Sequence, residues 1–456
     1  MKNTRRTFVR TLAVSTALIL GGTLAGCSAG NAGNGASANP GGGKPDTSRP
    51  ANEIHIYAFG DAAASVEQAA ADRFNKTSKV KVIVDKGADG GADYATQVRT
   101  TIGTKNSPDI FMSWGSAGIA DFVKAGAVLS LNDFIKENPK LKSSFLPSVF
   151  NEEVVNGQSY GIPMRGVGPV VLYYNKTVLD KNGLTPAKSL DELQSQVSKL
   201  SGAGVTPVAL SGADKWPTLM WFEYLYTRAA GNEALNKGLK GDQDFWSSAA
   251  SKKALTDLSA LVKSGAFGTK YASVKYGNDG SPKLLSTGKA AYELMGNWNY
   301  ATIAAGDKSF AENNLGWTTF PTVAGTTGTD TQLTGNLSNY YNVAANTRYP
   351  DTVAKFLTEL YSADFQKGEL AIGNLPPTTD ASTYIDQVPN ATQSSKDFLN
   401  FQLGLIKDAP SFQLSWDQVV PTSQSANLLN NVASYFSGAE SQDQFISTMQ
   451  SVVSAK

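Results

Sequence analysis

The sequence predicts an α/β protein of two or more domains, whose sheets are mostly parallel and carry helices on both faces. Two observations lead to this prediction. Stretches with alternating apolar residues, typical of strands, are followed by stretches with apolar residues at helical spacing, and such a series occurs twice. About 400 of the 456 residues lie beyond a leader and a polar linker, which is more than one hydrophobic core usually holds.

The first 26 residues are predicted to be a lipoprotein signal peptide. Basic residues precede an acid-free, mostly apolar run at 11–23 that is too short to span a bilayer in the mature protein. The run leads into LAGC at 24–27, which resembles the bacterial lipobox. Cys27 is the only cysteine, so it cannot form an internal disulfide, and we expect it to be lipidated rather than a buried thiol or a nucleophile. Residues 4–10 also resemble a twin-arginine signal, so both export routes stay open.

Residues 28–50 are rich in Gly, Ala, Asn, Ser and Pro and contain almost no large apolar side chain. Such a segment cannot bury enough surface to offset its ordering entropy. We therefore expect residues 27–50 to consist of the lipidated cysteine and a disordered tether, which holds the body of the protein away from the membrane.

Charge and composition exclude several classes of partner. The chain has 40 Lys and Arg against 39 Asp and Glu, so no basic surface for nucleic acid is indicated, and an uncharged ligand is favoured. A single histidine and a single cysteine rule out the common multi-histidine and multi-cysteine metal sites, and no cofactor is expected. After Pro50 no apolar run is long enough to span a membrane, so the lipid anchor would be the one membrane attachment.

The first α/β series begins at residue 53. Strand patterns at 53–61, 79–85 and 107–115 alternate with helical patterns at 65–78 and 94–102. His55 lies among apolar neighbours in the first strand, and we interpret it as structural. The third strand ends in Trp114 and Gly115, at the sheet edge where ligands of such folds bind.

The second series follows residue 184. Ser189 and Glu192 fit a capping box that opens a helix to about Leu200. A short strand at 205–210 then precedes a helix rich in tryptophan. Further on, an apolar face at 353, 356, 357 and 360 predicts a helix that begins near Pro350.

Three segments of the chain stand out together: YGIP…VLYYNKTVLDKNGL from residue 160, GKAAYELMGNW at 288–298 and NLPPTTDA at 374–381. In this order they resemble the carbohydrate-binding lipoproteins of bacterial ABC importers, the maltose-type (family 1) extracellular solute-binding proteins. The resemblance extends over nearly all of residues 51–456 and implies a two-lobed periplasmic-binding-protein fold with hinge strands and an interlobe ligand cleft. It places the first lobe at 51–163 plus 333–378 and the second at 164–332 plus 379–456.

The same resemblance implies a function. The protein would be a monomer on the extracellular face of the cell membrane, which captures a neutral oligosaccharide and delivers it to the transmembrane subunits of an ABC permease without catalysing a reaction. PDIFMSWGSAG at 108–118 and VKAGAV at 123–128 are similar to binding proteins for xylo-oligosaccharides. The alternative is a secreted glycoside hydrolase, which would need two carboxylates about 5–10 Å apart across the scissile bond.

Tryptophans are the first candidates for the site, because a pyranose ring presents an apolar C–H face that an indole can stack on. Trp298, Trp114 and Trp416 match positions where the family lines its cleft, although each could instead be a core residue. Trp216 and Trp221 are five residues apart, so we expect one in the site and the other in the core. We interpret Trp246 and Trp317 as structural.

Polar candidates come from the same comparison. Asp61, after the first strand, matches a position where the family often has a hydroxyl-binding acid, and Arg165 follows the first hinge crossing. Both could instead be solvated loop charges. Further candidates by proximity are Tyr160, Glu223, Asn297, Asn299 and Gln418.

Overall fold

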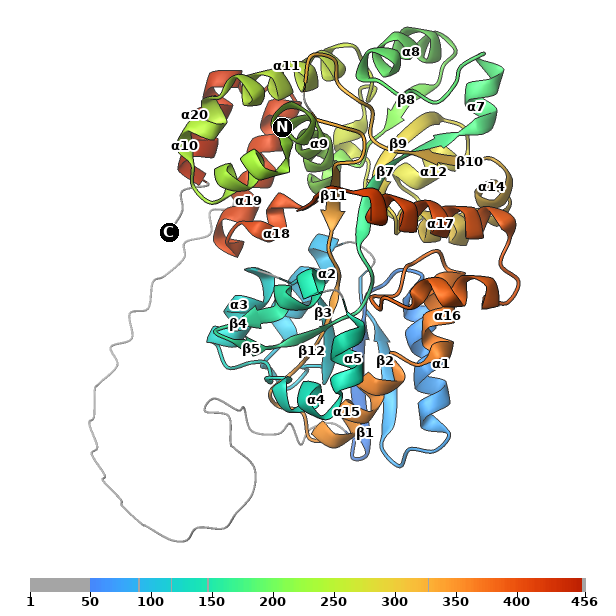
Figure 1. Ribbon diagram of the computed structural model, residues 1–456, viewed down its shortest axis with the longest axis vertical. Coiled ribbons are helices and arrows are strands. Elements are labelled where there is room, and N and C mark those ends of the chain that lie inside the picture. The colour runs from blue at the N-terminus through green and yellow to red at the C-terminus, as the bar shows by residue number, and fades with distance from the viewer. Residues whose placement is uncertain (1–49, 89–90, 116, 146, 327, 453–456) are drawn as a thin grey trace, which may run out of the picture. The chain divides into compact units, whose positions relative to one another are not determined.

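Two larger sheets, each covered by helices, organise the chain in the computed structural model (Figure 1). The structure describes residues 50–452 apart from 89–90, 116, 146 and 327, and these residues belong to one compact unit, Asn39–Lys456. The predicted signal peptide, Cys27 and nearly all of the predicted tether lie outside the described residues. In the part that is described, no helix has the length and apolar character needed to cross a bilayer.

The first sheet has the strand order β2-β1-β3-β12-β6. Strand β1 pairs in parallel with β2 and β3, whereas β12 runs antiparallel to both β3 and β6. Its strands are β1 (Glu53–Ala58), β2 (Lys81–Lys86), β3 (Ile110–Ser113), β6 (Gly161–Pro163) and β12 (Tyr340–Val343). We call this sheet and its helices the first lobe.

The second sheet has the order β13-β11-β7-β9-β8, with β10 also paired to β7. The pairs β11–β13 and β8–β9 are parallel, and β7 is antiparallel to its three partners. Its strands are β7 (Gly168–Asn175), β8 (Thr206–Ala209), β9 (Ala290–Gly296), β10 (Leu315–Thr318), β11 (Leu333–Asn336) and β13 (Phe412–Leu414). This sheet and its helices form the second lobe, and a small hairpin, β4 (Val154–Val155) and β5 (Gln158–Ser159), belongs to neither sheet.

Helices cover both sheets. The helices of the first lobe are α1 (Ala64–Asn75), α2 (Gly91–Thr101), α3 (Ala117–Lys124), α4 (Asn132–Glu137), α5 (Pro139–Ser144), α6 (Pro147–Phe150), η1 (Asn151–Glu153), α15 (Pro350–Glu359) and α16 (Ala363–Ala371). A further short helix, η4 (Ala381–Gln387), lies in the segment that leads from α16 to the second lobe. Those of the second lobe are α7 (Lys176–Lys181), α8 (Leu190–Gly202), η2 (Gly212–Asp214), α9 (Trp216–Leu239), α10 (Gln243–Ser247), α11 (Ala249–Lys263), η3 (Tyr271–Ser273), α12 (Ser281–Ser286), α13 (Asn299–Gly306), α14 (Lys308–Asn313), α17 (Gln393–Asp408), α18 (Trp416–Val419), α19 (Thr422–Phe436) and α20 (Gln442–Val452).

Periodicity predicted the individual elements well. The strands and helices expected between residues 53 and 115 correspond to β1, α1, β2, α2 and β3. The Ser189 hydroxyl accepts from the Glu192 backbone N–H as the capping box requires, while the Glu192 carboxylate accepts from the N–H of Lys188, one residue before the cap. The prediction of mostly parallel sheets was wrong, because strands that return from the other lobe enter each sheet in the opposite direction.

The chain passes between the lobes three times. The first crossing is residues 164–167, between β6 and β7, and the second is residues 337–339, between β11 and β12. The third crossing, residues 372–392, includes η4, which packs against both α16 and α17. The return to the first lobe therefore begins later than the predicted residue 333, because Leu333–Asn336 is paired within the second sheet.

Candidate functional site

The indole of Trp298 rests on backbone at the point where β9 ends and α13 begins. A side chain at Gly296 would overlap the Trp298 ring, and the Cβ of a residue at 168 would lie 3.6 Å from it. The absence of a side chain at Gly296 therefore lets the ring lie close to the main chain, whereas a Cβ at position 168 would make an ordinary contact with it. Trp298 is only partly buried, so the ring is held in place without being enclosed in the core.

Two more partly buried aromatic side chains continue from Trp298 along the second lobe. The Trp216 ring centroid lies 6.3 Å from that of Trp298, and the Tyr276 centroid lies 5.4 Å from that of Trp216. The Tyr276 hydroxyl is 3.0 Å from the hydroxyl of Thr302 on α13. Sequence reasoning missed Tyr276, because it lies in an irregular segment with no periodic signal.

Amide side chains surround a small hollow beside Trp298. The hollow, about 20 Å³, has room for roughly one water molecule. It is lined by Arg165, Gly166, Gly168, Asn297, Trp298, Asn336, Asn339, Asn374 and Leu375, which come from all three crossings and the end of β9. An amide offers both donors and an acceptor, so this wall suits hydroxyl groups. Of its asparagines only Asn297 was predicted.

Arg165 and Asp61 form an ion pair between the first crossing and the loop after β1. The Arg165 Nη2 donates to Asp61 Oδ1 at 3.2 Å, and Nη1 lies 3.2 Å from Asp61 Oδ2. Only 10% of the Arg165 side chain and 19% of the Asp61 side chain are exposed, so neither residue is the solvated loop charge considered as an alternative. Asp61 also accepts from the backbone N–H of Ala63, which holds the start of α1.

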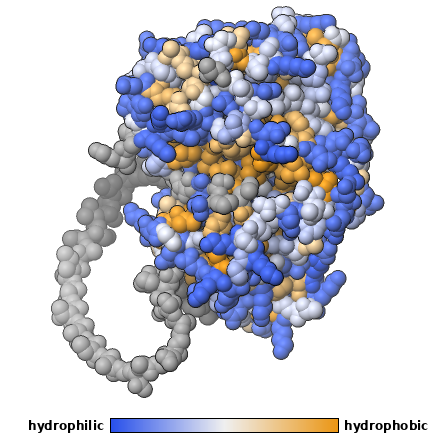
Figure 2. Space-filling view, in the orientation of Figure 1, coloured by the Kyte–Doolittle hydropathy of each residue, from blue (hydrophilic) through white to orange (hydrophobic). Residues whose placement is uncertain are grey.

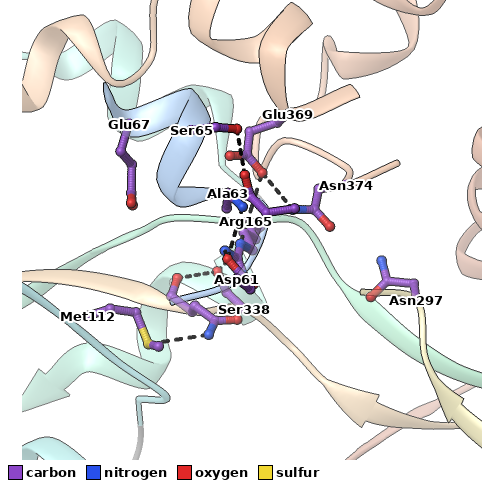
Figure 3. A network of polar contacts seen from close by, with 12 residues as sticks. Asp61, Ala63, Ser65, Glu67, Met112, Arg165, Asn297, Ser338, Glu369 and Asn374 are labelled. Carbon is purple, nitrogen blue, oxygen red and sulfur yellow. Dashed lines mark hydrogen bonds and ion pairs between the residues drawn. The ribbon is translucent and has the colours of Figure 1, made fainter. Parts of the chain in front are cut away.

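Two buried glutamates share the surroundings of Arg165 (Figure 3). Glu369 Oε2 lies 4.0 Å from Arg165 Nε, and Glu67 accepts a hydrogen bond from the Tyr341 hydroxyl at 2.8 Å. Burial raises the pKa of Glu67 to about 8 and that of Glu369 to about 7, although Arg165 lowers both. Burial alone would lower the pKa of Arg165, but the Asp61, Glu369 and Glu67 carboxylates raise it, so the guanidinium stays charged.

A second hollow, about 650 Å³, lies on the other side of Asp61. Its walls come from α1, the end of β2, α13, α14 and the third crossing, and its lining within the described residues includes no tryptophan. Alanines of α13 and α14 contribute much of the wall. Figure 2 shows apolar side chains in a band across the middle of the visible face.

Trp114 lies on the first lobe, in the segment that follows β3. Its ring meets Phe59 and Tyr94 edge to face, with centroids 6.0 and 5.9 Å away. The ring is partly buried against the core of the first lobe.

Trp416 and Trp221 do not lie at the site. Both are completely buried in the core of the second lobe. The Trp416 ring is enclosed by aromatic rings from α9 and α10, among them Phe222 and Trp246, with centroids 5.4 and 5.5 Å away. The expectation that Trp416 lines the cleft was therefore wrong, and of the pair on α9 it is Trp221 that belongs to the core. Trp246 is buried as predicted.

Other polar candidates also serve the interior. Glu223 is fully buried and accepts from Thr334, Ser415 and the Trp416 backbone N–H, and burial raises its pKa to about 8. Asn299 is fully buried and donates to Glu293. Among the described residues no group of three His, Cys, Asp or Glu side chains could hold a metal ion.

Comparison with known proteins identifies relatives of the whole fold. The family model described as bacterial extracellular solute-binding protein matches residues 60–367. An uncharacterized ABC transporter extracellular-binding protein from Pyrococcus horikoshii is 26% identical over 355 residues, which cover 74% of each chain. A probable sugar-binding periplasmic protein from Mesorhizobium japonicum is 25% identical over 56% of this chain and 60% of its own length.

The solved structures include a protein described in connection with xylan utilization by the thermophilic bacterium Caldanaerobius polysaccharolyticus. It superimposes with a TM-score of 0.75 and 25% sequence identity, over 88% of this chain and 98% of that chain. The fold of this chain is therefore shared with that solved structure over most of its length.

Proposed function

Since this chain belongs to the bacterial extracellular solute-binding protein family, we propose that it captures an uncharged oligosaccharide between its lobes for delivery to an ABC importer. The observation that carries this proposal is the Trp298 ring, which lies against the backbone of Gly296 and is bordered by amide side chains. An indole platform suits the C–H face of a pyranose, and amides at its edge suit the hydroxyls around the ring.

The charges at the site favour a neutral ligand. Arg165 lines the small hollow, but Asp61 occupies both of its terminal nitrogens and Glu369 lies beside its Nε. These acids already balance the charge of Arg165, so a carboxylate or phosphate ligand would add negative charge without a cation to pair with it. A hydroxyl can bind at the same place without breaking the pair.

The relatives support one class of sugar as the ligand. One relative is named as a probable sugar-binding protein, and a solved relative is described for xylan utilization. Together with the segments at 108–118 and 123–128, which are similar to xylo-oligosaccharide-binding proteins, this favours xylo-oligosaccharides as the ligand. Trp298, Trp216 and Tyr276 would provide the stacking surface on the second lobe, and Trp114 would provide it on the first.

The remaining parts of the proposal concern location and chemistry. We propose that Cys27 carries the lipid anchor at the extracellular face of the membrane, that the protein acts as a monomer with permease subunits as partners, and that it does not cleave its ligand. Buried glutamates such as Glu223 accept several internal hydrogen bonds, and this suits a structural role better than the paired acids of a glycoside hydrolase.

A thermal-shift screen tests the function directly. Purified protein is heated with xylo-, malto-, cello- and chito-oligosaccharides and, as a control, with acidic sugars of the same length. We expect at least one neutral series to raise the melting temperature, because a ligand that binds only the folded state stabilises it. A response to the charged series alone, or release of reducing ends from any oligosaccharide during prolonged incubation, would contradict the proposal.

A further inference from the structure

Gln402 on α17 is completely buried, and its side-chain amide accepts one hydrogen bond and donates another. Its Oε1 accepts from Asn297 Nδ2 at 2.6 Å, and its Nε2 donates to the backbone carbonyl of Gly373 at 3.2 Å. Asn297 directly precedes Trp298, and Gly373 belongs to the third crossing. One side chain thus joins the turn that carries Trp298 to a segment that leads into the first lobe.

The contacts continue from Gly373 to the first lobe. Asn374 donates through Nδ2 to Glu369 at 2.9 Å, and Glu369 lies beside Arg165, which is paired with Asp61. The backbone N–H of Gly166 donates to the carbonyl of Leu375 at 2.7 Å, which ties the first and third crossings together. Figure 3 shows how Asn374, Glu369, Arg165 and Asp61 follow one another.

Apart from Asp61, every side chain of this series is almost completely buried. The exposed fraction is 7% for Asn297, 0% for Gln402, 4% for Asn374, 1% for Glu369 and 9% for Arg165. A buried amide or carbonyl without a hydrogen-bond partner destabilises the protein more than an exposed one, which can bond to water. The series therefore favours the arrangement of the lobes in which all of its hydrogen bonds are made.

Packing at Gly373 supports the same conclusion. Gly373 has a φ of +89°, a conformation that favours glycine, and a Cβ there would lie 2.5 Å from the ring of Tyr300 on α13. The third crossing therefore contacts the helix that follows Trp298 through its backbone as well as through Gln402. A change in the angle between the lobes would have to alter these contacts.

We infer that Gln402 is a positioning residue for ligand binding, which holds the Trp298 turn against the third crossing and so favours the arrangement of the lobes in which these contacts are made. This inference rests on the proposed function for its effect on sugar affinity. Gln402 itself does not touch the sugar. Its removal lowers the population of the binding-competent state, and the affinity for every ligand falls by the same factor.

The test compares Gln402→Met with the wild type by calorimetric titration with short and long oligosaccharides from the responding series. We expect the affinity to fall about tenfold for both lengths, which corresponds to the loss of two hydrogen bonds of ordinary net strength. The matched control is Gln413→Met, because Gln413 is a buried glutamine of the same lobe whose Nε2 donates to Leu414 and not to a crossing.

A second readout needs no ligand. In full-length Cys27→Ser protein, Glu137→Cys on α4 and Lys263→Cys on α11 introduce two exposed thiols, one on each lobe, as the only cysteines of the chain. The distance distribution between spin labels at these positions should shift when Gln402→Met is added, and should not shift with Gln413→Met.

Three results would overturn the inference: unchanged affinity and unchanged distances in Gln402→Met, an equal effect of Gln413→Met, or an affinity loss that depends on the length of the sugar. The last would mean that Gln402 acts on the ligand itself. If no oligosaccharide binds the wild type, the proposed function fails, and the label distances still decide whether Gln402 holds the lobes.

Discussion

The guanidinium of Arg165, in the first crossing, makes two contacts with the carboxylate of Asp61, in the loop after β1. The Nη2–Oδ1 and Nη1–Oδ2 distances are both 3.2 Å. Arg165 also lowers the pKa values of the buried acids Glu369 and Glu67. One side chain therefore balances several carboxyl groups at the hinge.

We predict that Arg165→Met destabilises the protein by about 3–5 kcal/mol, because it leaves these acids without their cation. Urea denaturation measures the loss. The control is Arg73→Met, whose ion pair with Glu359 is about a quarter to a third exposed, and whose removal should cost about 1 kcal/mol or less. Equal losses of stability in the two variants would show that the buried Arg165 pair contributes no more than the partly exposed Arg73 pair.

The buried glutamates predict how stability depends on pH. Burial raises the pKa of Glu153 from 4.5 to about 8, although Asn342 and Ser113 donate to its carboxyl group. The folded state therefore binds the proton of the Glu153 carboxyl group more tightly than the unfolded state. The contribution of this proton to stability is complete below about pH 4.5 and is lost as the pH rises through about 8.

We therefore expect the free energy of unfolding to fall between about pH 5 and pH 9, and to fall less steeply in Glu153→Gln, which has no proton to lose there. Each group contributes at most about 1.4 kcal/mol per pH unit to the slope. Urea denaturation at a series of pH values measures both slopes. Parallel curves for variant and wild type would mean that Glu153 does not titrate in this range.

Replacing Trp416 should lower the stability of the protein and leave its sugar affinity unchanged, the reverse of what is expected for a residue of the binding site. Since its ring is completely enclosed by aromatic neighbours, we expect Trp416→Ala to cost about 3–5 kcal/mol of stability. The folded fraction should keep its affinity for sugar. A variant with normal stability and lost affinity would show that Trp416 belongs to the binding site.

The lipid anchor has its own test. Cys27→Ser should release the protein from the membrane fraction into the medium, because no other residue can carry the thioether-linked lipid. Detergent phase partitioning and incorporation of labelled fatty acid measure the anchor. Continued membrane association of the variant together with unchanged fatty-acid labelling would refute the lipobox interpretation.

Sequence periodicity predicted most of the fold, since apolar residues at strand or helix spacing must face a core in either lobe. It could not decide which tryptophans face the cleft. Trp298 and Trp416 each lie two residues after a strand, where a helix begins. Only contacts with residues far away in the chain, such as Phe222 and Trp246, bury one of them. The sheet to which Leu333–Asn336 belongs is likewise a matter of long-range pairing.

For Glu223, which the sequence analysis named as a candidate for the site, the local sequence does indicate burial. Glu223 lies in WFEYLY, where apolar residues on all sides of a helix indicate a buried acid rather than a ligand contact. The amides of Asn336, Asn339 and Gln402 had no such signal, because single amides in mixed segments resemble any exposed residue. Their role depends on where the crossings meet.

Calorimetric titration of Trp298→Ala with the oligosaccharide that stabilises the wild type most is the most direct test of the account. The matched control is Trp317→Ala, a partly buried tryptophan of the same lobe that packs against Phe398 away from the small hollow. We predict a loss of affinity of about tenfold or more for Trp298→Ala and little change for the control. Equal affinities for Trp298→Ala and the wild type would contradict the claim that this indole carries the sugar.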